Sequence, residues 1–139
     1  SMQITRQADY ALRAMLYLAR LGMDKKAATS LIAQEKRIPP SFLAKIISQL
    51  SIAGLIHTSR GAHGGVSLAR KPEEISVLEV VEAIDGPIAL NDCTHDAADC
   101  PFGDDCPLRV LWCSAQGELI HRLRNTTFAQ FVQSQSQGS

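Results

Sequence analysis

The sequence predicts a mostly α-helical fold with a small β-wing: a winged helix-turn-helix followed by a long C-terminal helix. Apolar residues recur at helical spacing in several segments, and a glycine-rich turn separates two short alternating segments. The chain has 139 residues, 45% of them hydrophobic and 5% aromatic, which suits one compact domain with an appended element. No apolar run approaches the roughly 20 residues that a membrane span needs, and the N-terminus lacks the apolar core of a secretory signal. We therefore expect a cytoplasmic protein without a membrane span.

Residues 6–21 are predicted to form the first helix. Thr5 stands where a side-chain cap is expected, and Gly22 ends the pattern. Between them, one face of the helix is apolar and is expected to pack against the rest of the domain. The residues of this face are Ala8, Ala11, Leu12, Met15, Leu18 and Ala19.

A second, short helix is predicted over residues 30–36. Thr29 is expected to be its cap, and Leu31 and Ile32 are expected to face inward. The helix carries polar residues on its other side. Its length of about two turns fits the first helix of a helix-turn-helix.

The Pro39-Pro40-Ser41 sequence predicts the start of a third helix, because proline fits the first turn of a helix but not its interior. This helix is expected to end near residue 53, before Gly54. Its predicted inward residues are Leu43, Ile46, Ile47 and Leu50. Two helices joined by so short a turn, the second with a polar outer face, are typical of a helix-turn-helix.

Residues 55–59 and 66–69 are predicted to form two short strands. The sequence between them, Arg-Gly-Ala-His-Gly-Gly over residues 60–65, is typical of a hairpin tip. Glycine permits positive φ and lets the backbone approach another molecule closely, although a simple turn needs the same residues. A helix-turn-helix followed by a hairpin with an arginine at its tip predicts a winged helix.

A capping box formed by Ser76 and Glu79 predicts the start of the next helix, which ends at Gly86. Residues 87–106 then show no clear period. A loop of about 20 residues inside a compact domain is unusual unless something organises it. The sequence therefore predicts a bound group in this loop.

A long helix is expected from residue 107 or 108 to about residue 125. Its apolar stripe consists of Leu108, Leu111, Trp112, Ala115, Leu119 and Leu123. Trp112 is interpreted as a packing residue, since a single aromatic side chain at helical spacing usually belongs to a core. Residues 127–132 are expected to form a last short helix, and residues 133–139, rich in Gln and Ser, a disordered tail.

Charge divides the chain into two halves. Residues 1–71 carry 11 Lys or Arg and 3 Asp or Glu, a net charge of +8, whereas residues 72–139 carry 3 and 11, a net charge of −8. A basic surface binds a polyanion by releasing counterions, although many basic surfaces are only solvated. The asymmetry therefore favours a nucleic-acid partner for the first half and excludes the second half from that role.

Three cysteines fall within the aperiodic loop with the spacing Cys93-x6-Cys100-x5-Cys106. In a cytosolic chain such a group indicates metal or redox chemistry rather than structural disulfides. Without C-x-x-C pairs the spacing suits zinc poorly, whereas three thiolates from one loop suit three corners of a 2Fe-2S or 4Fe-4S cluster. Binding would also supply the ordering energy that the loop lacks. The spacing favours an iron–sulfur cluster, with zinc and redox-active or incidental thiols as alternatives.

The sequence leaves open which residue would be the fourth ligand of the cluster. His95 lies two positions after Cys93 and is within reach. Cys113 lies about two helical turns beyond Cys106, where it is interpreted as a small, inward-facing core residue. The chain has no reactive C-x-x-C pair, so we expect no thiol oxidoreductase activity and no enzyme.

Five short motifs precede the three-cysteine loop, and with it they carry a family resemblance that covers roughly residues 2–132. They are Ile4-Thr5-x4-Tyr10-Ala11-Leu12-Arg13-Ala14-Met15, Phe42-Leu43-Ala44-Lys45-Ile46-Ile47-Ser48-Gln49-Leu50, Ala53-Gly54-Leu55, Arg60-Gly61-x2-Gly64-Gly65 and Val80-Val81-x2-Ile84-Asp85-Gly86. In combination they resemble the Rrf-type (IscR/NsrR/RirA-like) winged-helix regulators of bacteria. The resemblance implies a homodimer, joined largely by the long helix, that binds a palindromic promoter site. It also implies one iron–sulfur cluster per subunit, whose state controls DNA affinity.

The resemblance also implies roles for single residues. Cys93, Cys100 and Cys106 would be the cluster thiolates. Some members use a histidine at the position of Arg109, so that ligand pattern is not met here. The nitric-oxide-sensing members are more similar in the third helix, and one of them takes an aspartate from the first helix of the partner subunit. The matching residue is Asp9, which equally suits a first-turn acid that complements the helix dipole.

We therefore expect a DNA-binding transcriptional regulator, a repressor by preference. The third helix would enter the major groove of double-stranded DNA, with Ser41 and Lys45 toward bases or phosphates. The wing would lie against the minor groove; its predicted contact residues are Arg60, His63, Gly64 and Gly65. The signal is left open between nitric oxide, iron availability and redox status. The alternative is a cluster-free regulator that responds to a metabolite, a partner protein or thiol oxidation.

The expected organisation has four parts. Residues 2–86 form the winged helix-turn-helix domain, and residues 87–106 form the cluster-binding loop. Residues 107–132 contain the dimerisation helix and the terminal helix, and residues 133–139 form the tail.

Overall fold

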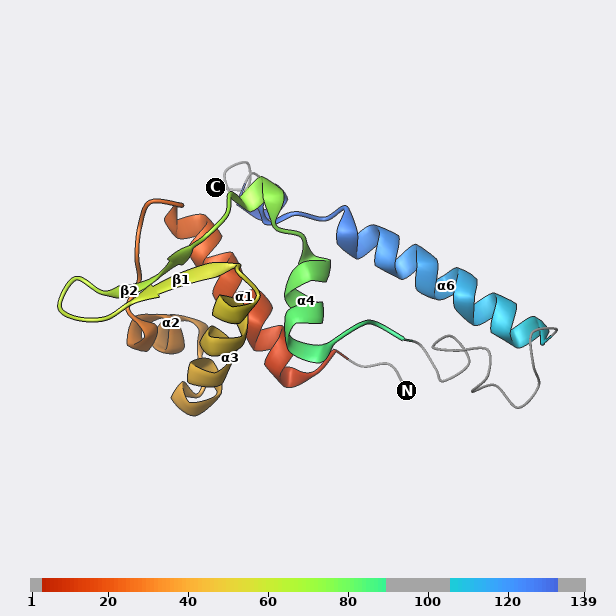
Figure 1. Cartoon of the computed structure of the whole chain (residues 1–139), viewed down its shortest axis with the longest axis horizontal. Helices are drawn as coiled ribbons and strands as arrows, with labels where there is room; N and C mark the ends of the chain where they lie inside the picture. Colours follow the sequence, from red (N-terminus) through yellow and green to blue (C-terminus); the bar gives the residue numbers. More distant parts are fainter. Residues whose placement is uncertain (1–3, 90–105, 133–139) are drawn as a thin grey trace.

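The computed structural model of the chain describes residues 4–89 and 106–132. The elements in chain order are α1 (Arg6–Leu21), α2 (Thr29–Lys36), α3 (Pro40–Ile52), β1 (Ile56–Ser59), β2 (Gly65–Leu68), a 3-10 turn (Pro72–Glu74), α4 (Val77–Asp85) and α6 (Pro107–Arg124). The first four helices and the hairpin form one body, and α6 extends away from it (Figure 1). No helix in residues 4–89 or 106–132 has the length and apolarity to cross a membrane.

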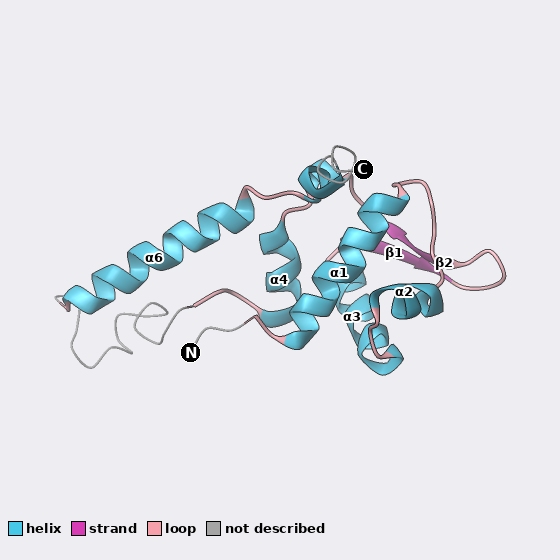
Figure 2. Cartoon of the chain, turned by 180° about the vertical axis from the view of Figure 1, so that it is seen from behind, coloured by secondary structure: helices cyan, strands magenta, loops and turns pink. Residues whose placement is uncertain are grey.

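Helix α1 lies at the centre of this body and packs against α2, α3 and α4 (Figure 2). The predicted cap is confirmed: the Thr5 hydroxyl oxygen accepts a hydrogen bond from the Ala8 N–H at 3.1 Å. The helix ends at Gly22, whose φ of 117° is costly for other residues. The buried residues are Ala8, Ala11, Ala14, Met15, Leu18 and Ala19, so the predicted apolar face is the core face, with Leu12 half-buried beside it.

Helix α2 differs from the prediction at its start. Ala28 occupies the cap position and no side chain caps the helix, so the predicted Thr29 cap is wrong. The preceding residue, Ala27, exchanges backbone hydrogen bonds of 2.9 and 2.8 Å with Val66, and this pairing fixes the chain just before the helix begins. Leu31 is 41% exposed whereas Ile32 is fully buried, because α2 buries only a narrow face.

Helix α3 follows the prediction closely. Pro40 stands in its first turn, and its buried residues are Leu43, Ile46, Ile47 and Leu50. After it the chain turns at Gly54, which has a φ of 78°. Strands β1 and β2 then pair antiparallel, with Ile56 opposite Leu68 and Ser59 opposite Gly65. The predicted winged helix-turn-helix is therefore confirmed.

The two glycines at the base of the wing meet the protein's own backbone. A Cβ atom at Gly64 would lie 2.4 Å from the Ser59 carbonyl oxygen, and one at Gly65 would lie 2.8 Å from the Ala27 carbonyl oxygen. Gly65 also has a φ of 151°. Both positions thus require glycine so that the hairpin can close. This requirement accounts for the two glycines even without a close contact between the wing backbone and another molecule.

The C-terminal segment returns to the body beside α4. The predicted capping box is present, with the Ser76 hydroxyl accepting from the Glu79 N–H at 3.1 Å and the Glu79 carboxylate accepting from the Ser76 N–H at the same distance. The Val77 N–H donates to the Thr126 carbonyl oxygen at 2.8 Å. Residues 128–132 are helical, and Phe128 is 2% exposed. The C-terminal end of α6 is therefore anchored to the body, while its other end stands away.

Candidate nucleic-acid interface and cluster site

Helix α3 presents a polar outer face on the same side of the molecule as the wing. Ser41, Lys45 and Ser48 are exposed, whereas Leu43 and Ile46 hold the opposite face in the core. The outward positions follow one another at helical spacing. The structure thus places both predicted α3 residues, Ser41 and Lys45, where a second molecule can reach them.

An aromatic contact holds the start of α3 against α1. The rings of Tyr10 and Phe42 have centroids 6.1 Å apart at an interplanar angle of 54°, a geometry that is favourable for aromatic pairs. Phe42 is 39% exposed. The contact fixes the first turn of α3, so Phe42 positions the neighbouring Ser41.

The wing tip carries the other predicted contact residues. Arg60 and His63 are both exposed. A further cation stands at the wing base, where the Lys26 ammonium lies 3.5 Å from the Ser59 hydroxyl. No local pattern marks Lys26 as a contact residue, because the place of the Lys25-Lys26 pair beside the wing follows only from the fold.

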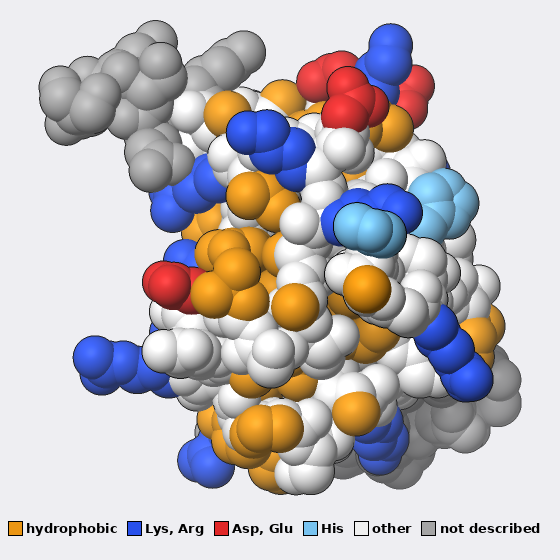
Figure 3. Space-filling view, turned by 90° about the vertical axis from the view of Figure 1, so that its left-hand side faces the viewer, with side chains coloured by type: hydrophobic (Ala, Val, Ile, Leu, Met, Phe, Trp, Pro, Cys, Tyr) orange, Lys and Arg blue, Asp and Glu red, His pale blue; other side chains and the backbone are white. Residues whose placement is uncertain are grey.

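This end of the molecule is acid-poor. Figure 3 views it along the long axis: Lys and Arg side chains lie around its edge, and most acidic side chains gather at one border. Around α2, α3 and the wing the chain carries Lys25, Lys26, Lys36, Arg37, Lys45 and Arg60 against Asp24 and Glu35. Such a distribution attracts a polyanion to this end of the fold.

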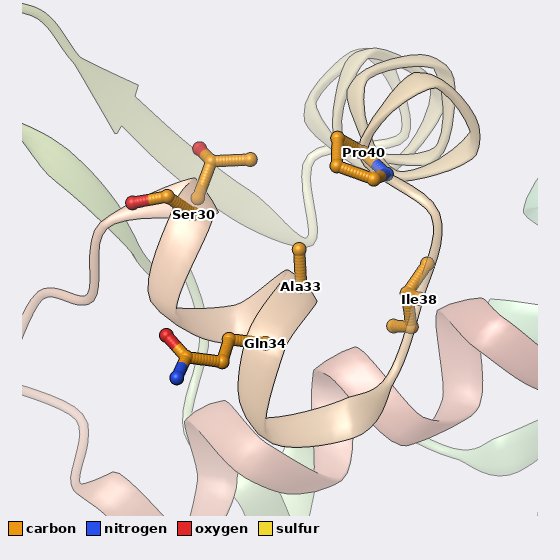
Figure 4. Close-up of a pocket in the computed structure, with 6 residues that line it drawn as sticks. Ser30, Ala33, Gln34, Ile38 and Pro40 are labelled. Atoms are coloured by element: carbon orange, nitrogen blue, oxygen red, sulfur yellow. The ribbon is translucent and has the colours of Figure 1, made fainter.

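A hollow separates α2 from the beginning of α3 on the same side (Figure 4). Its lining residues are Thr29, Ser30, Ala33, Gln34, Ile38 and Pro40. None of these side chains is charged, and most of the wall is alkyl. The hollow therefore has no group that would fix a metal ion or a charged ligand.

Cys106 is the one predicted cluster thiol that the structure describes; Cys93, Cys100 and His95 lie outside the described residues. Cys106 is half-buried and occupies the N-cap position of α6. Cys106 therefore stands where α6 meets the segment that carries the other two cysteines. Within residues 4–89 and 106–132, no three Cys, His, Asp or Glu side chains come together as a metal site.

Asp9 is ion-paired within its own helix. Its carboxylate lies 3.0 Å from the Arg13 guanidinium, and both side chains are about half exposed. Exposed ion pairs of this kind are weak. The pair with Arg13 therefore leaves the Asp9 carboxylate free to bind another group. In Figure 1 the start of α6, with Cys106, lies well away from the first turn of α1. Within one chain, Asp9 and Cys106 are not brought together.

A hydrogen-bonded link joins the start of α1 to the end of α4. The Thr5 hydroxyl donates to the Asp85 carboxylate at 2.6 Å, and the Thr5 N–H donates to its other oxygen at 3.4 Å. Asp85 would be unfavourable at the end of α4, but here it complements the positive end of α1. Gly86 and the cysteine segment follow directly, so this link fixes the point where that segment leaves the body.

Helix α6 has no buried residue in the described structure. Trp112 is 39% exposed and Leu111 is 53% exposed, and Cys113 is also exposed. The interpretations of Trp112 as a core residue and of Cys113 as an inward residue are therefore wrong for the single chain. The reason is that α6 leaves the body, with its main contact to α4.

A second apolar surface lies on the body. A groove there is formed by Leu12, Arg13, Leu16, Val77, Phe128 and Phe131. Phe128 and Phe131 meet edge to face, with centroids 5.8 Å apart. The apolar stripe of α6 and this groove are both uncovered, and apolar surface of this kind marks interaction sites.

A winged helix-turn-helix with an outward polar α3, an arginine-tipped wing and a basic, acid-poor end defines a DNA-binding transcriptional regulator. Residues 4–134 match the family described as Rrf2, iron-dependent transcriptional regulator. The chain belongs to the Rrf2 family, as its motifs indicated.

Individual relatives agree with this assignment. The HTH-type transcriptional regulator NsrR of Shouchella clausii is 33% identical over 132 residues, which cover 94% of this chain and 89% of that protein. The structure of CymR, the global cysteine regulator of B. subtilis, superimposes with a TM-score of 0.83 at 24% identity and covers 96% of this chain and 98% of that one. The structure of IscR from T. potens superimposes with a TM-score of 0.81 at 22% identity. The match covers 100% of this chain and 92% of that one. The NsrR and CymR proteins are named as regulators, in agreement with the prediction that this chain is not an enzyme.

Proposed function

We propose that this protein is a homodimeric repressor in the cytoplasm that binds a palindromic promoter site and whose DNA affinity is controlled by an iron–sulfur cluster. The observation that carries the DNA-binding part is the joint exposure of Ser41 and Lys45 on α3 and of Arg60 on the wing, on one basic end. In this arrangement α3 enters the major groove and Arg60 and His63 reach the neighbouring minor groove. Gly64 and Gly65 shape the wing, and their backbone would contact the DNA, since glycine has no side chain.

The dimer is supported by α6. Helices in proteins gain most of their stability by packing an apolar face, whereas α6, with 18 residues, exposes Leu108, Leu111 and Trp112. A second copy provides a matching stripe and the uncovered groove beside Leu12 and Leu16. A symmetric pair of winged helices then fits two half-sites of a palindrome.

The cluster is supported by the thiol set and by the family. Cys93, Cys100 and Cys106 would hold it, and the family is described as iron-dependent. When bound, an iron–sulfur cluster supplies a redox- and nitric-oxide-sensitive centre. Asp9 could complete the ligand set only from the partner subunit, because its own Cys106 is distant (Figure 1). Nitric oxide, iron supply and redox status are all compatible signals.

A cluster-free regulator is the second candidate. The same fold serves the B. subtilis protein described as the global cysteine regulator. In that case a metabolite, a partner protein or thiol oxidation would take the role of the signal, and Cys106 and the exposed Cys113 would be available thiols.

The salt dependence of DNA binding tests the proposed interface. We expect the logarithm of the association constant to fall against the logarithm of salt concentration with a slope of about −5, because a dimer that neutralises about six phosphates releases their counterions. The measurement is fluorescence anisotropy with a duplex selected from a random pool. A slope shallower than about −2 would contradict the basic end as the DNA interface.

The variant Arg60→Ala tests the wing. We expect the affinity for the selected duplex to fall about tenfold to a hundredfold, because one arginine contact of about 1 kcal/mol is lost in each subunit. Dimer mass and visible absorption should stay unchanged. Arg122→Ala, which removes the same charge from exposed α6, is the matched control and should bind normally. Equal affinities of the two variants would remove Arg60 from the interface.

A further inference from the structure

A groove of about 390 Å³ runs between α3 and the wing. Five residues that carry hydroxyl groups line it from three elements: Thr29 of α2, Ser48 and Ser51 of α3, and Thr58 and Ser59 of β1. Arg60 is the charged residue of the lining, and the lining contains no acidic residue. The side chain of Ser59 alternates with that of Thr58 along β1, so the Ser59 hydroxyl, with the Lys26 ammonium 3.5 Å away, lies toward the other face of the hairpin. The groove is therefore rich in hydrogen-bond donors and positive in charge.

Most of these hydroxyl groups make no hydrogen bond to another residue of the described structure. Thr29 does not cap α2. Among the residues that the structure describes, Ser59 has the Lys26 contact, whereas no side-chain hydrogen bond within the protein involves Thr29, Ser51 or Thr58. Ser48 and Thr58 are exposed. A row of unused donors beside the Arg60 cation fits an extended anionic chain better than a single small ion.

We propose that this groove is a phosphate channel, which holds the DNA backbone strand that separates the major groove at α3 from the minor groove at the wing. This proposal rests on the proposed mode of DNA binding. A helix in one groove and a wing in the next place one phosphodiester strand between them, and the groove occupies that space. Hydroxyl groups of Ser and Thr are common phosphate ligands and carry no sequence information. The channel thus fixes the register between α3 and the wing, independently of base sequence.

The test removes two channel hydroxyls while keeping the fold. Ser51→Ala favours helix, and Thr58→Val keeps a β-branched residue in the strand. We expect the double variant to bind the selected duplex and a random duplex about tenfold more weakly, by the same factor for both, because neutral hydrogen bonds to phosphate are lost in each subunit. The slope of the salt dependence should not change, because no charge is removed.

The probe that locates the contact is a series of selected duplexes, each with one backbone phosphate replaced by a neutral methylphosphonate. Wild-type protein should lose affinity when the replaced phosphate lies between the bases contacted by α3 and the minor groove contacted by the wing. The double variant should lose much less affinity at that same position. Ser67→Ala is the matched control: Ser67 pairs with His57, one position along from Thr58, so its hydroxyl lies on the other face of the hairpin.

The outcomes separate the channel from the general function. Unchanged affinity of the double variant, or an unchanged methylphosphonate effect, would overturn the channel even if Arg60→Ala still weakens binding. A wild-type protein that does not distinguish the selected duplex from a random one would instead overturn the proposed function. Weakened binding by Ser67→Ala equal to that of the double variant would also contradict the channel.

Discussion

A protein carrying Trp112→Glu is expected to be monomeric and to lose its affinity for the selected duplex by about a thousandfold or more. Trp112 is the largest side chain of the exposed α6 stripe, and aromatic residues of this kind dominate binding energy in interfaces. The substitution removes that contact and places an unpaired carboxylate where the second copy would bury it, which is strongly unfavourable. Once the dimer is lost, each half-site must be bound by an independent domain.

Sedimentation or light scattering measures the mass, and anisotropy measures DNA binding. Ser114→Glu is the matched control, because Ser114 is exposed on α6 and lies about 160° around the helix from Trp112. We expect this control to remain a dimer with normal affinity. A dimeric Trp112→Glu protein would show that another surface joins the subunits.

The elements of the winged helix were largely predictable because their signals are local. Proline at the start of α3, the Ser76–Glu79 capping box and the glycine after α1 each act within one turn of the chain. The start of α2 was not predictable in this way. It depends on the pairing of Ala27 with Val66, residues far apart in sequence, and this pairing overrides the local preference for a Thr29 cap.

The candidate DNA-binding residues also fall into a group that local motifs predict and a group that only the fold reveals. Ser41, Lys45 and Arg60 follow from their place in local motifs, and the structure leaves all three exposed. Lys26 and the hydroxyls of the channel belong to segments that meet only in the folded chain, so no local pattern marks them. Trp112 shows the opposite problem: an apolar stripe predicts burial but not whether the covering partner is the same chain or a second one.

The proposed cluster yields the second large prediction. We expect protein prepared without oxygen to contain iron and acid-labile sulfide and to absorb broadly in the visible range, and we expect Cys106→Ala to lose all three properties. Thiolates are the ligands that these clusters require, and Cys106 is presented at the N-terminus of α6. Cys113→Ala removes an exposed thiol of the same helix and should keep them.

Metal analysis and visible spectroscopy of the two variants decide between the candidates. A colourless wild-type protein with stoichiometric zinc, lost in Cys106→Ala, would replace the cluster by a zinc site. Wild-type protein with neither metal nor sulfide that still binds the selected duplex would favour the cluster-free regulator, and the thiols would then be tested as the signal. Iron and sulfide retained in Cys106→Ala would contradict the assignment of this ligand. If the cluster is present, titration with nitric oxide should change the affinity of the wild-type protein for the selected duplex and leave that of Cys106→Ala constant, because only the former holds the reacting centre.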